Sequence, residues 1–347
     1  MKYFLKILFL VPIYAFGQNF EEKELIILQE KEGFEISGTL TIPQNNPDFK
    51  IGIMITGSGQ TDRDETIGKH KIFRDLAHKL ADHGIATFRY DDRGGYKSKG
   101  PKVQNSTADQ LAADAVSVFS YLQKNYPGHK TGFIGHSEGG GLSAMASVLA
   151  PKTSFVVSLA GIARNGMDVL VQQNYDIFVK SKLPEKDVNA YLDQFFKPVL
   201  NFVTAEPDSL KKLNFILETG KKFREQNPDA ALALRSNTSE KMAPMFQKQL
   251  DNPWFISFLK SNPVDYWKKI KCKTLALNGS LDVQVSPVND LGAIEKLNNK
   301  HITCKVLEKH NHLFQVAETG SLAEYYTIKE SVSEETIKVV SEFLNSF

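Results

Sequence analysis

Short apolar runs alternate with amphipathic helical segments along this chain of 347 residues. Strand-like runs stand at 24–28, 34–42, 51–55, 85–90, 131–135, 155–160, 274–278 and 302–307, and helical spacing marks 71–83, 108–125, 287–297, 333–346 and the segment from Glu138. The run at 34–42 alternates apolar and polar residues, as a half-buried antiparallel strand does. Buried strands that alternate with helices of this length form a parallel sheet through right-handed crossovers. The sequence therefore predicts an α/β fold with a mostly parallel, twisted sheet and helices on both faces.

A helical block interrupts the alternation. Residues 162–265 have helical patterning, no convincing strand and many phenylalanines, and they end in an aromatic stretch at 253–258. Because the sheet pattern resumes afterwards, we interpret the block as a cap inserted into one core rather than as an independent domain in series. The predicted core has two parts, residues 18–161 and 266–347, and the predicted cap is 162–265.

The first 17 residues have the three parts of a secretory signal peptide. A positive start with two lysines is followed by an apolar run over residues 7–16 and by small residues before a cut at Gln18. This run is too short to span a bilayer as a helix, which needs about 20 apolar residues. The alternative is an ordinary buried N-terminal strand or helix. We expect residues 1–17 to direct export to the periplasm or the extracellular space, with no stable membrane insertion of the mature protein.

Composition excludes several classes of protein. The chain is 41% hydrophobic and 24% charged, as soluble globular proteins are, and two cysteines are too few for a disulfide scaffold. Its 42 basic and 40 acidic residues give a net charge of +2, which is too weak for a nucleic-acid partner. The excess belongs to Lys2 and Lys6, so the chain after the predicted signal peptide is charge-balanced.

The sharpest local motif is Gly135-x-Ser137-x-Gly139, which lies between an apolar strand and a helix rich in small residues. This strand–turn–helix setting is required of a nucleophile elbow. The turn forces the serine into a strained backbone conformation, and side chains at the two glycine positions would collide with the neighbouring strand and helix. The alternative is a glycine-rich turn with an inert serine. The setting favours Ser137 as a nucleophile, exposed above the sheet beside a helix N-terminus.

A serine hydroxyl needs a general base, which follows the acid in the chain order of this kind of site. Asp282 follows the strand at 274–278, and His310 and His312 follow the strand at 302–307. Asp290 is the rival acid, but it falls within a predicted helix. The residues themselves leave the base open between His310 and His312.

The other histidines are interpreted as surface or structural residues: His70, His78, His83, His129, His136 and His301. The spacing His310-x-His312 also occurs in metal sites, but no further cluster of histidine and carboxylate ligands supports one. We therefore expect no metal and no cofactor.

Acyl transfer also requires hydrogen-bond donors for the developing oxyanion. One donor should be the backbone N–H of Glu138, the residue after the nucleophile, and the other should come from the loop at residues 56–60. Ser58 N–H is our first choice in that loop and Gly59 N–H our second. The loop lacks the Gly-Lys-Ser/Thr ending of a phosphate-binding loop, so that alternative is set aside.

Aromatic residues at the end of the predicted cap are candidates for substrate contact. Trp254, Phe255 and Phe258 could contact an apolar part of the substrate or pack the cap onto the core, and the sequence does not decide between these roles. Cys272 and Cys304 flank or lie in neighbouring strands, but the geometry of parallel strands often misses the Cα separation that a disulfide requires. We expect both to be core thiols.

Several of these segments together resemble the bacterial α/β-hydrolase esterases of the serine aminopeptidase-like group. The resemblance covers nearly all of the chain after the predicted signal peptide and lies in residues 56–59, 62–65, 89–94, 135–140, 275–282 and 311–315. It implies the α/β-hydrolase fold with a helical cap, and a catalytic triad of Ser137, Asp282 and His312. His312 is implied rather than His310 because the family's histidine follows an asparagine. One departure is Tyr96, where the family commonly has a glycine.

The resemblance also implies carboxylester hydrolysis, usually tested on short acyl chains. The predicted function is therefore a secreted serine hydrolase that cleaves a small-molecule ester through an acyl-enzyme. One alternative is a serine aminopeptidase with the same triad, in which cap carboxylates bind an α-amine. The other is a non-catalytic binding protein on a hydrolase fold, which would be expected to have a broken triad, whereas all three residues are present.

Overall fold

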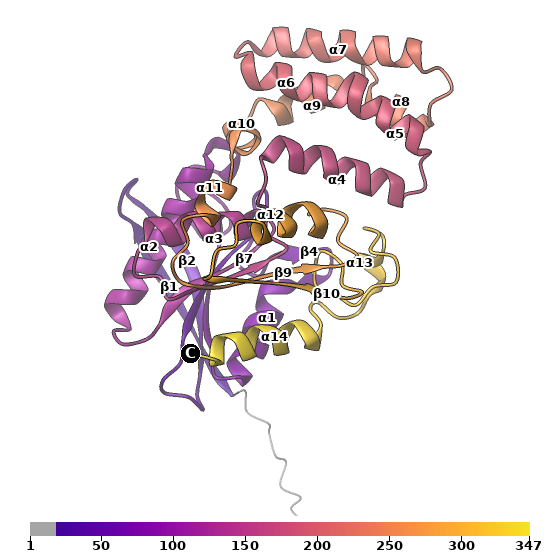
Figure 1. Cartoon of the computed structure of the whole chain (residues 1–347). Helices are drawn as coiled ribbons and strands as arrows, with labels where there is room; N and C mark the ends of the chain where they lie inside the picture. The colour runs from indigo at the N-terminus through magenta and orange to yellow at the C-terminus, as the bar shows by residue number, and fades with distance from the viewer. Residues whose placement is uncertain (1–18) are drawn as a thin grey trace, which may run out of the picture.

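An eight-stranded sheet forms the centre of the computed structural model, which describes residues 19–347 (Figure 1). Its order is β1 (Phe20–Gln29), β2 (Phe34–Pro43), β6 (Ala86–Tyr90), β3 (Ile51–Ile55), β7 (Thr131–His136), β8 (Phe155–Leu159), β9 (Lys273–Gly279) and β10 (Ile302–Leu307). The first two strands pair antiparallel, and all pairs from β6 to β10 are parallel. The predicted α/β fold with a mostly parallel sheet is confirmed.

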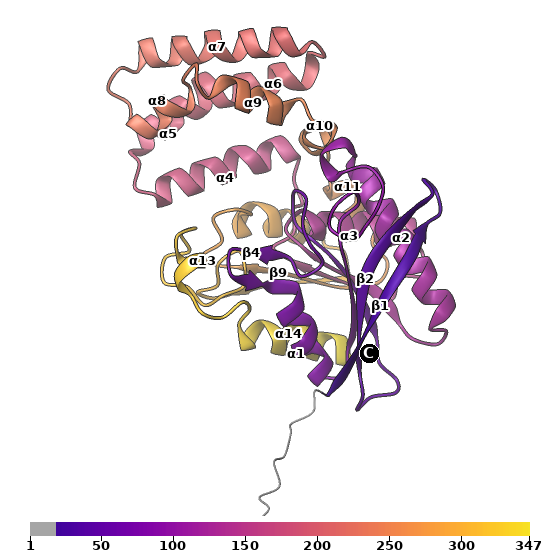
Figure 2. The same ribbon diagram turned by 180° about the vertical axis from the view of Figure 1, so that it is seen from behind.

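Helices cover both faces of this sheet (Figures 1 and 2). One face packs against α1 (Ile72–Asp82) and α14 (Glu334–Asn345), and the other against α2 (Ala108–Asn125) and α3 (Glu138–Leu149). The strand β2 is almost wholly buried rather than half-buried. The reason is that long side chains cover its polar face: Glu24 and Glu22 of the neighbouring strand β1 accept hydrogen bonds from Thr39 and Thr41, and Arg63 donates to Thr39.

The predicted helix at 287–297 is shorter and less regular than expected. A π-helical turn at Pro287–Leu291 leads into α12 (Gly292–Glu295), and the chain then returns toward β10. The helix α11 (Val264–Trp267), which precedes β9, packs with α12 against α3. Small elements that the sequence did not indicate are β4 (Thr66–Ile67), β5 (His70–Lys71) and α13 (Glu324–Thr327).

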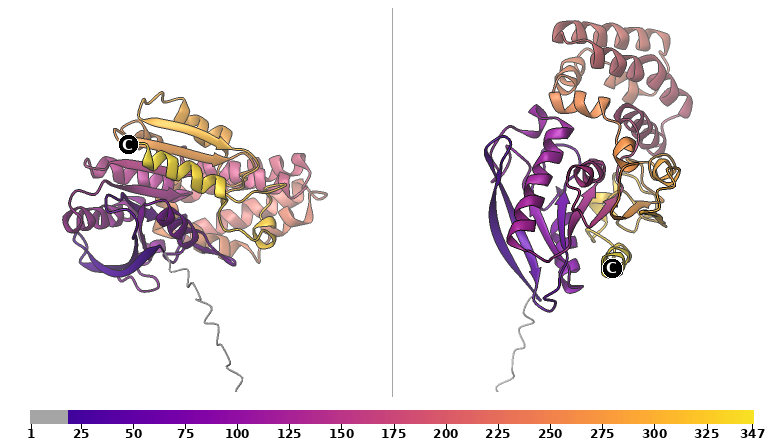
Figure 3. Two further views of the ribbon diagram at one scale, coloured as in Figure 1. Left: turned by 90° about the horizontal axis from the view of Figure 1, so that it is seen from below. Right: turned by 60° about the vertical axis from the view of Figure 1, so that its left-hand side comes forward.

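A group of helices stands over one end of the sheet (Figure 3). It comprises α4 (Gly166–Lys180), α5 (Glu185–Tyr191), α6 (Lys197–Ala205), α7 (Ser209–Gln226), α8 (Leu232–Asn237), α9 (Ala243–Leu250) and α10 (Pro253–Lys260). Phe195, Phe196 and Phe223 are buried in a separate apolar core within it, which accounts for the abundance of phenylalanine in this region. This group corresponds to the block that the sequence marks as a cap.

The parallel strands bring the predicted site residues to one edge of the sheet. Ser137 follows β7, the loop at 56–60 follows β3, Asp282 follows β9, and His312 follows β10. Carboxyl ends of parallel strands meet at the same edge, where the sheet's crevice holds ligands in open α/β folds. The helical cap stands over this edge (Figure 1).

The predicted signal peptide at residues 1–17 lies outside the described residues. Across residues 19–347, none of the helices is both long and apolar enough to cross a bilayer.

Both cysteines are free thiols, as predicted. Cys304 pairs with Ala276 in the register of β10 and β9, and Cys272 lies four residues before Ala276, just ahead of β9. At about 3.3 Å per residue this offset is roughly 13 Å, well beyond the reach of a disulfide. Burial raises the pKa of Cys272 and raises that of Cys304 to about 11, so both remain protonated at neutral pH.

Candidate active site

Ser137 occupies a strained turn between β7 and α3. Its backbone has φ 55° and ψ −121°, a conformation that side chains rarely adopt. A Cβ added at Gly135 would lie 2.0 Å from the carbonyl oxygen of Gly139, and one added at Gly139 would lie 2.0 Å from that of Ile55. Both glycines of the motif are therefore required by close backbone packing, which is the steric arrangement predicted for a nucleophile elbow.

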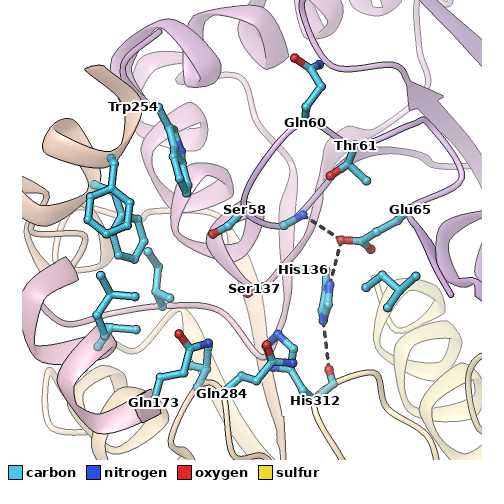
Figure 4. A pocket seen from close by; sticks show the side chains of 18 of the residues that line it. Ser58, Gln60, Thr61, Glu65, His136, Ser137, Gln173, Trp254, Gln284 and His312 are labelled. Atoms are coloured by element: carbon cyan, nitrogen blue, oxygen red, sulfur yellow. Dashed lines mark hydrogen bonds and ion pairs between the residues drawn. The ribbon is translucent and has the colours of Figure 1, made fainter. Parts of the chain in front are cut away.

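His312 and Asp282 form a buried hydrogen-bonded pair. His312 Nδ1 lies 2.8 Å from Asp282 Oδ2, while Asp282 Oδ1 accepts the backbone N–H groups of Gln284 and Val285. A carboxylate fixed in this way holds the imidazole with its proton on Nδ1 and leaves Nε2 free to act as a base. Ser137 and His312 line the same cavity without a direct hydrogen bond among the described residues, as catalytic groups often do before substrate binds (Figure 4).

The rival base and acid are engaged elsewhere. His310 Nδ1 lies 2.7 Å from the carbonyl oxygen of Glu308, and its Nε2 lies 2.7 Å from Ser333 Oγ. Asp290 accepts hydrogen bonds from the backbone and the guanidinium of Arg164. Both residues are buried structural groups, so the geometry favours His312 and Asp282, in agreement with the resemblance.

The loop after β3 carries the candidate oxyanion donors. Gly57 N–H is already committed, because it donates to Glu65 Oε1 at 2.8 Å. The backbone N–H groups of Ser58 and Glu138 have no acceptor among residues 19–347. Ser58 lines the cavity together with Ser137, whereas Gly59 lines a separate, smaller hollow. The structure therefore places Ser58 better than Gly59 for the second donor.

Glu65 and His136 connect three parts of the site, and sequence reasoning missed both as functional residues. His136 Nδ1 lies 2.9 Å from Glu65 Oε1, the same oxygen that accepts Gly57 N–H. His136 Nε2 lies 3.0 Å from the carbonyl oxygen of His312, to which it must donate (Figure 4). Burial alone would lower the pKa of His136, but the charge and the hydrogen bond of Glu65 raise it. The only sequence signals were the places of Glu65 in segment 62–65 and of His136 in segment 135–140, both of which carry the family resemblance.

Glu138, directly after the nucleophile, joins the core to the cap. Trp254 Nε1 on α10 donates to both carboxylate oxygens of Glu138, at 3.0 and 3.2 Å. Burial raises the pKa of Glu138 to about 7. Trp254 also lines the cavity, as do Phe255 and Phe258, which are at the same time buried in the packing of α10. These aromatics thus pack α10 and line the cavity, and their contact with a substrate stays a prediction.

The raised pKa of Glu138 predicts a pH-dependent stability. Between pH 4.5 and about 7 the folded protein keeps the proton on Glu138, which the unfolded chain has lost. The stability that this proton contributes to the folded state is therefore full below pH 4.5 and is lost as the pH rises to about 7. Glu138→Gln keeps an oxygen for Trp254 but has no charge to bury. At pH 8 this variant should therefore be more stable than the wild type by roughly 3 kcal/mol, at about 1.4 kcal/mol per pKa unit. Urea unfolding at pH 5 and pH 8 measures the difference, and the same difference at both pH values would contradict the prediction.

Tyr96 stands at the mouth of the cavity, where the family commonly has a glycine. Its backbone φ of 53° lies in the left-handed region that favours glycine, and its side chain is 65% exposed. The loop therefore keeps the conformation that a glycine would adopt, at a cost in backbone strain. The departure places an aromatic side chain at the rim of the cavity.

Part of the chain is similar in sequence to known proteins. Residues 67–193 match the family model described as "Serine aminopeptidase, S33". Over 163 residues the chain is 30% identical to esterase EstD of Thermotoga maritima, a region that spans 47% of this chain and only 38% of that esterase.

Solved structures show the same fold. The esterase Pf2001 of Pyrococcus furiosus has a TM-score of 0.56 at 18% identity, covering 94% of this chain and 91% of that one. The α/β hydrolase GrgF from Penicillium sp. sh18 has a TM-score of 0.54 at 15% identity, covering 94% and 98%. The predicted α/β-hydrolase fold and the predicted resemblance are thus confirmed.

Proposed function

We propose that this chain, an α/β-hydrolase-fold protein that resembles the serine aminopeptidase-like esterases, is a serine hydrolase that cleaves small-molecule carboxylic esters. The observation that carries the proposal is the hydrogen-bonded His312–Asp282 pair, in a cavity that it shares with Ser137 at a strained elbow. The cavity has a volume of about 360 Å³, which suits a small ester with a short acyl chain.

The proposed mechanism has two steps. His312 takes the proton of Ser137 as the serine oxygen attacks the ester carbonyl, and Asp282 stabilises the imidazolium that forms. The N–H groups of Ser58 and Glu138 stabilise the oxyanion, and His312 then gives the proton to the leaving alcohol. A water molecule, activated by His312 in the same way, releases the acid from Ser137.

The lining of the cavity favours an ester over a peptide with a free α-amine. An α-ammonium group needs a carboxylate partner, and Glu65 is the one acidic residue among those that line the cavity in the described chain. Glu65 is buried, and its Oε1 is occupied by His136 and by Gly57 N–H. Its Oε2 has no hydrogen-bond partner among the described residues but is shielded from solvent. The one carboxylate in the described lining is thus paired with His136 and closed to a ligand, which disfavours an aminopeptidase substrate.

A set of three substrates tests the ester assignment against the aminopeptidase alternative. The protein should hydrolyse p-nitrophenyl propionate, and it should show no preference for alanine p-nitroanilide over propionyl p-nitroanilide, which differ only in the α-amine. Release of p-nitrophenol or p-nitroaniline is followed by absorbance. Faster cleavage of the alanine anilide than of the propionyl anilide would favour the aminopeptidase, and inactivity on the ester would contradict the proposal.

We also propose that residues 1–17 direct export of the enzyme. The proposal is supported by the positive start, the short apolar run and the small residues before Gln18. The mass of the protein recovered from expressing cells gives its first residue, and an intact N-terminus in the exported fraction would contradict cleavage before Gln18.

A further inference from the structure

We propose that the cavity contains separate acyl and alcohol subsites, and that the alcohol subsite accepts a neutral, hydroxyl-bearing alcohol such as glycerol or a sugar. This inference rests on the proposed ester hydrolysis. The leaving oxygen must lie next to His312, because His312 is the group that protonates it. The side chains around His312 therefore contact the alcohol part of the ester.

Two glutamines line the His312 side of the cavity. In Figure 4, Gln173 and Gln284 lie on the His312 side of Ser137, and Trp254 lies on the other side. Gln284 Nε2 donates to the Tyr325 hydroxyl at 3.0 Å, and its Oε1 has no partner among the described residues. The side-chain amide of Gln173 likewise has no hydrogen-bond partner in residues 19–347, so both amides have polar atoms free for a ligand.

The helix α4 carries both kinds of lining residue. Val169 and Leu170 line the cavity one turn before Gln173, and Val169 packs with Ile162 and Phe258 in a small apolar cluster. Residues three and four apart share one face of a helix. The same face of α4 therefore presents an apolar surface and then an amide. We assign the apolar surface, together with Trp254, to the acyl group.

The chemical class of the alcohol follows from the charge of the lining. An amide offers two donors and an acceptor without net charge, which matches hydroxyl groups. Lysine and arginine are absent from the described lining, and its one carboxylate is buried against His136. An anionic or cationic alcohol would therefore lose its hydration without gaining a partner. A neutral polyol would exchange its water contacts for the amides of Gln173 and Gln284.

A matched pair of esters tests the alcohol subsite. Glycerol 1-monoacetate and propyl acetate share the acyl group and the three-carbon alcohol, and they differ by two hydroxyls. Two additional hydrogen bonds should raise kcat/KM for the monoacetate about tenfold over that for propyl acetate, at a few-fold for each bond. In Gln173→Met, which keeps the length of the side chain, this ratio should fall to within about threefold of unity.

The neighbouring residue supplies the control. Gln172 is on the same helix, but its amide donates to Asp176 and it is not among the cavity residues. Gln172→Met should therefore keep the wild-type ratio of kcat/KM for the two esters. This ratio is measured for all three proteins by the release of acetate, with p-nitrophenyl acetate as the reference substrate.

The outcomes separate this inference from the proposed function. Equal kcat/KM for the two esters in the wild type, with p-nitrophenyl acetate hydrolysed, overturns the alcohol subsite and leaves the esterase intact. If Gln173→Met lowers kcat/KM equally for both esters, the alcohol subsite is also overturned, because the side chain of Gln173 then acts through packing. Hydrolysis of none of the three esters overturns the proposed function and the subsite with it.

Discussion

Ser137→Ala should lower kcat/KM for p-nitrophenyl acetate by at least about 10⁴-fold, because the acyl-enzyme cannot form without the serine oxygen. The residual rate should come from the oxyanion donors and from binding, which do not involve this hydroxyl. Alanine tolerates the strained backbone of the elbow no worse than serine does, so the variant should fold. Stopped assays of p-nitrophenol release measure the loss.

A serine in the same helix provides the control for this prediction. Ser147 is on α3, and its hydroxyl donates to the carbonyl oxygen of Ala144 within that helix, away from the cavity. Ser147→Ala should retain the wild-type rate within about twofold, since this buried hydroxyl is bonded within its own helix and does not line the cavity. A fluorophosphonate probe should label the wild type at Ser137 and should not label Ser137→Ala. Activity in Ser137→Ala equal to that of the wild type would exclude Ser137 as the nucleophile.

The elements that position the proposed triad could be predicted from local sequence. Ser137 follows β7 directly, Asp282 stands three residues after β9, and His312 stands five residues after β10. Because strand ends of a parallel sheet share one edge, a local pattern was enough to place residues that are 30 or more apart in sequence. The steric need for Gly135 and Gly139 is equally local.

The choice between His310 and His312 depended on contacts that no local pattern contains. The two histidines are the same residue type two positions apart, and both are buried. His310 is fixed by Ser333, which belongs to the start of α14, and by the bridge that it forms with Val316. Only the folded arrangement of the chain's last part separates the structural histidine from the one that contacts Asp282.

The orientation of the cap was also beyond sequence reasoning. Helical periodicity indicates that helices form, but the cap has an apolar core of its own, so the pattern does not show which face meets the active site. Gln173 is a polar residue at the edge of an apolar helical stripe, which is ordinary for an exposed position. Its place in the cavity became visible only with α4 docked over the sheet.

Glu65 and His136 are the positioning residues whose replacement should have the largest effect outside the triad. Glu65 Oε1 accepts the N–H of Gly57, which fixes the loop that contains Ser58. The same oxygen is bonded to His136, and His136 donates to the backbone carbonyl of His312. His136 donates to the His312 carbonyl through Nε2, so a bond from Nδ1–H to Glu65 makes it an imidazolium paired with a carboxylate. One oxygen atom thus keeps the oxyanion loop and the histidine loop in fixed positions relative to each other.

Glu65→Ala should lower kcat for p-nitrophenyl acetate by about 10²-fold with KM changed less than about threefold, because misplacing one oxyanion donor costs roughly 10²–10³ in rate. Glu65→Gln loses the charge that holds the second proton on His136, but it keeps an acceptor for Gly57 N–H. Because of that acceptor, the variant should recover at least about tenfold of the lost kcat. His70 is the control: it is buried and its Nε2 lies 2.7 Å from the carbonyl oxygen of Tyr325, outside the cavity. If His70→Ala lowers kcat as much as Glu65→Ala does, or if Glu65→Gln recovers nothing, the effect is general destabilisation. A selective loss of kcat in Glu65→Ala with recovery in Glu65→Gln would show that the Gly57 N–H acceptor sets the geometry of the oxyanion hole.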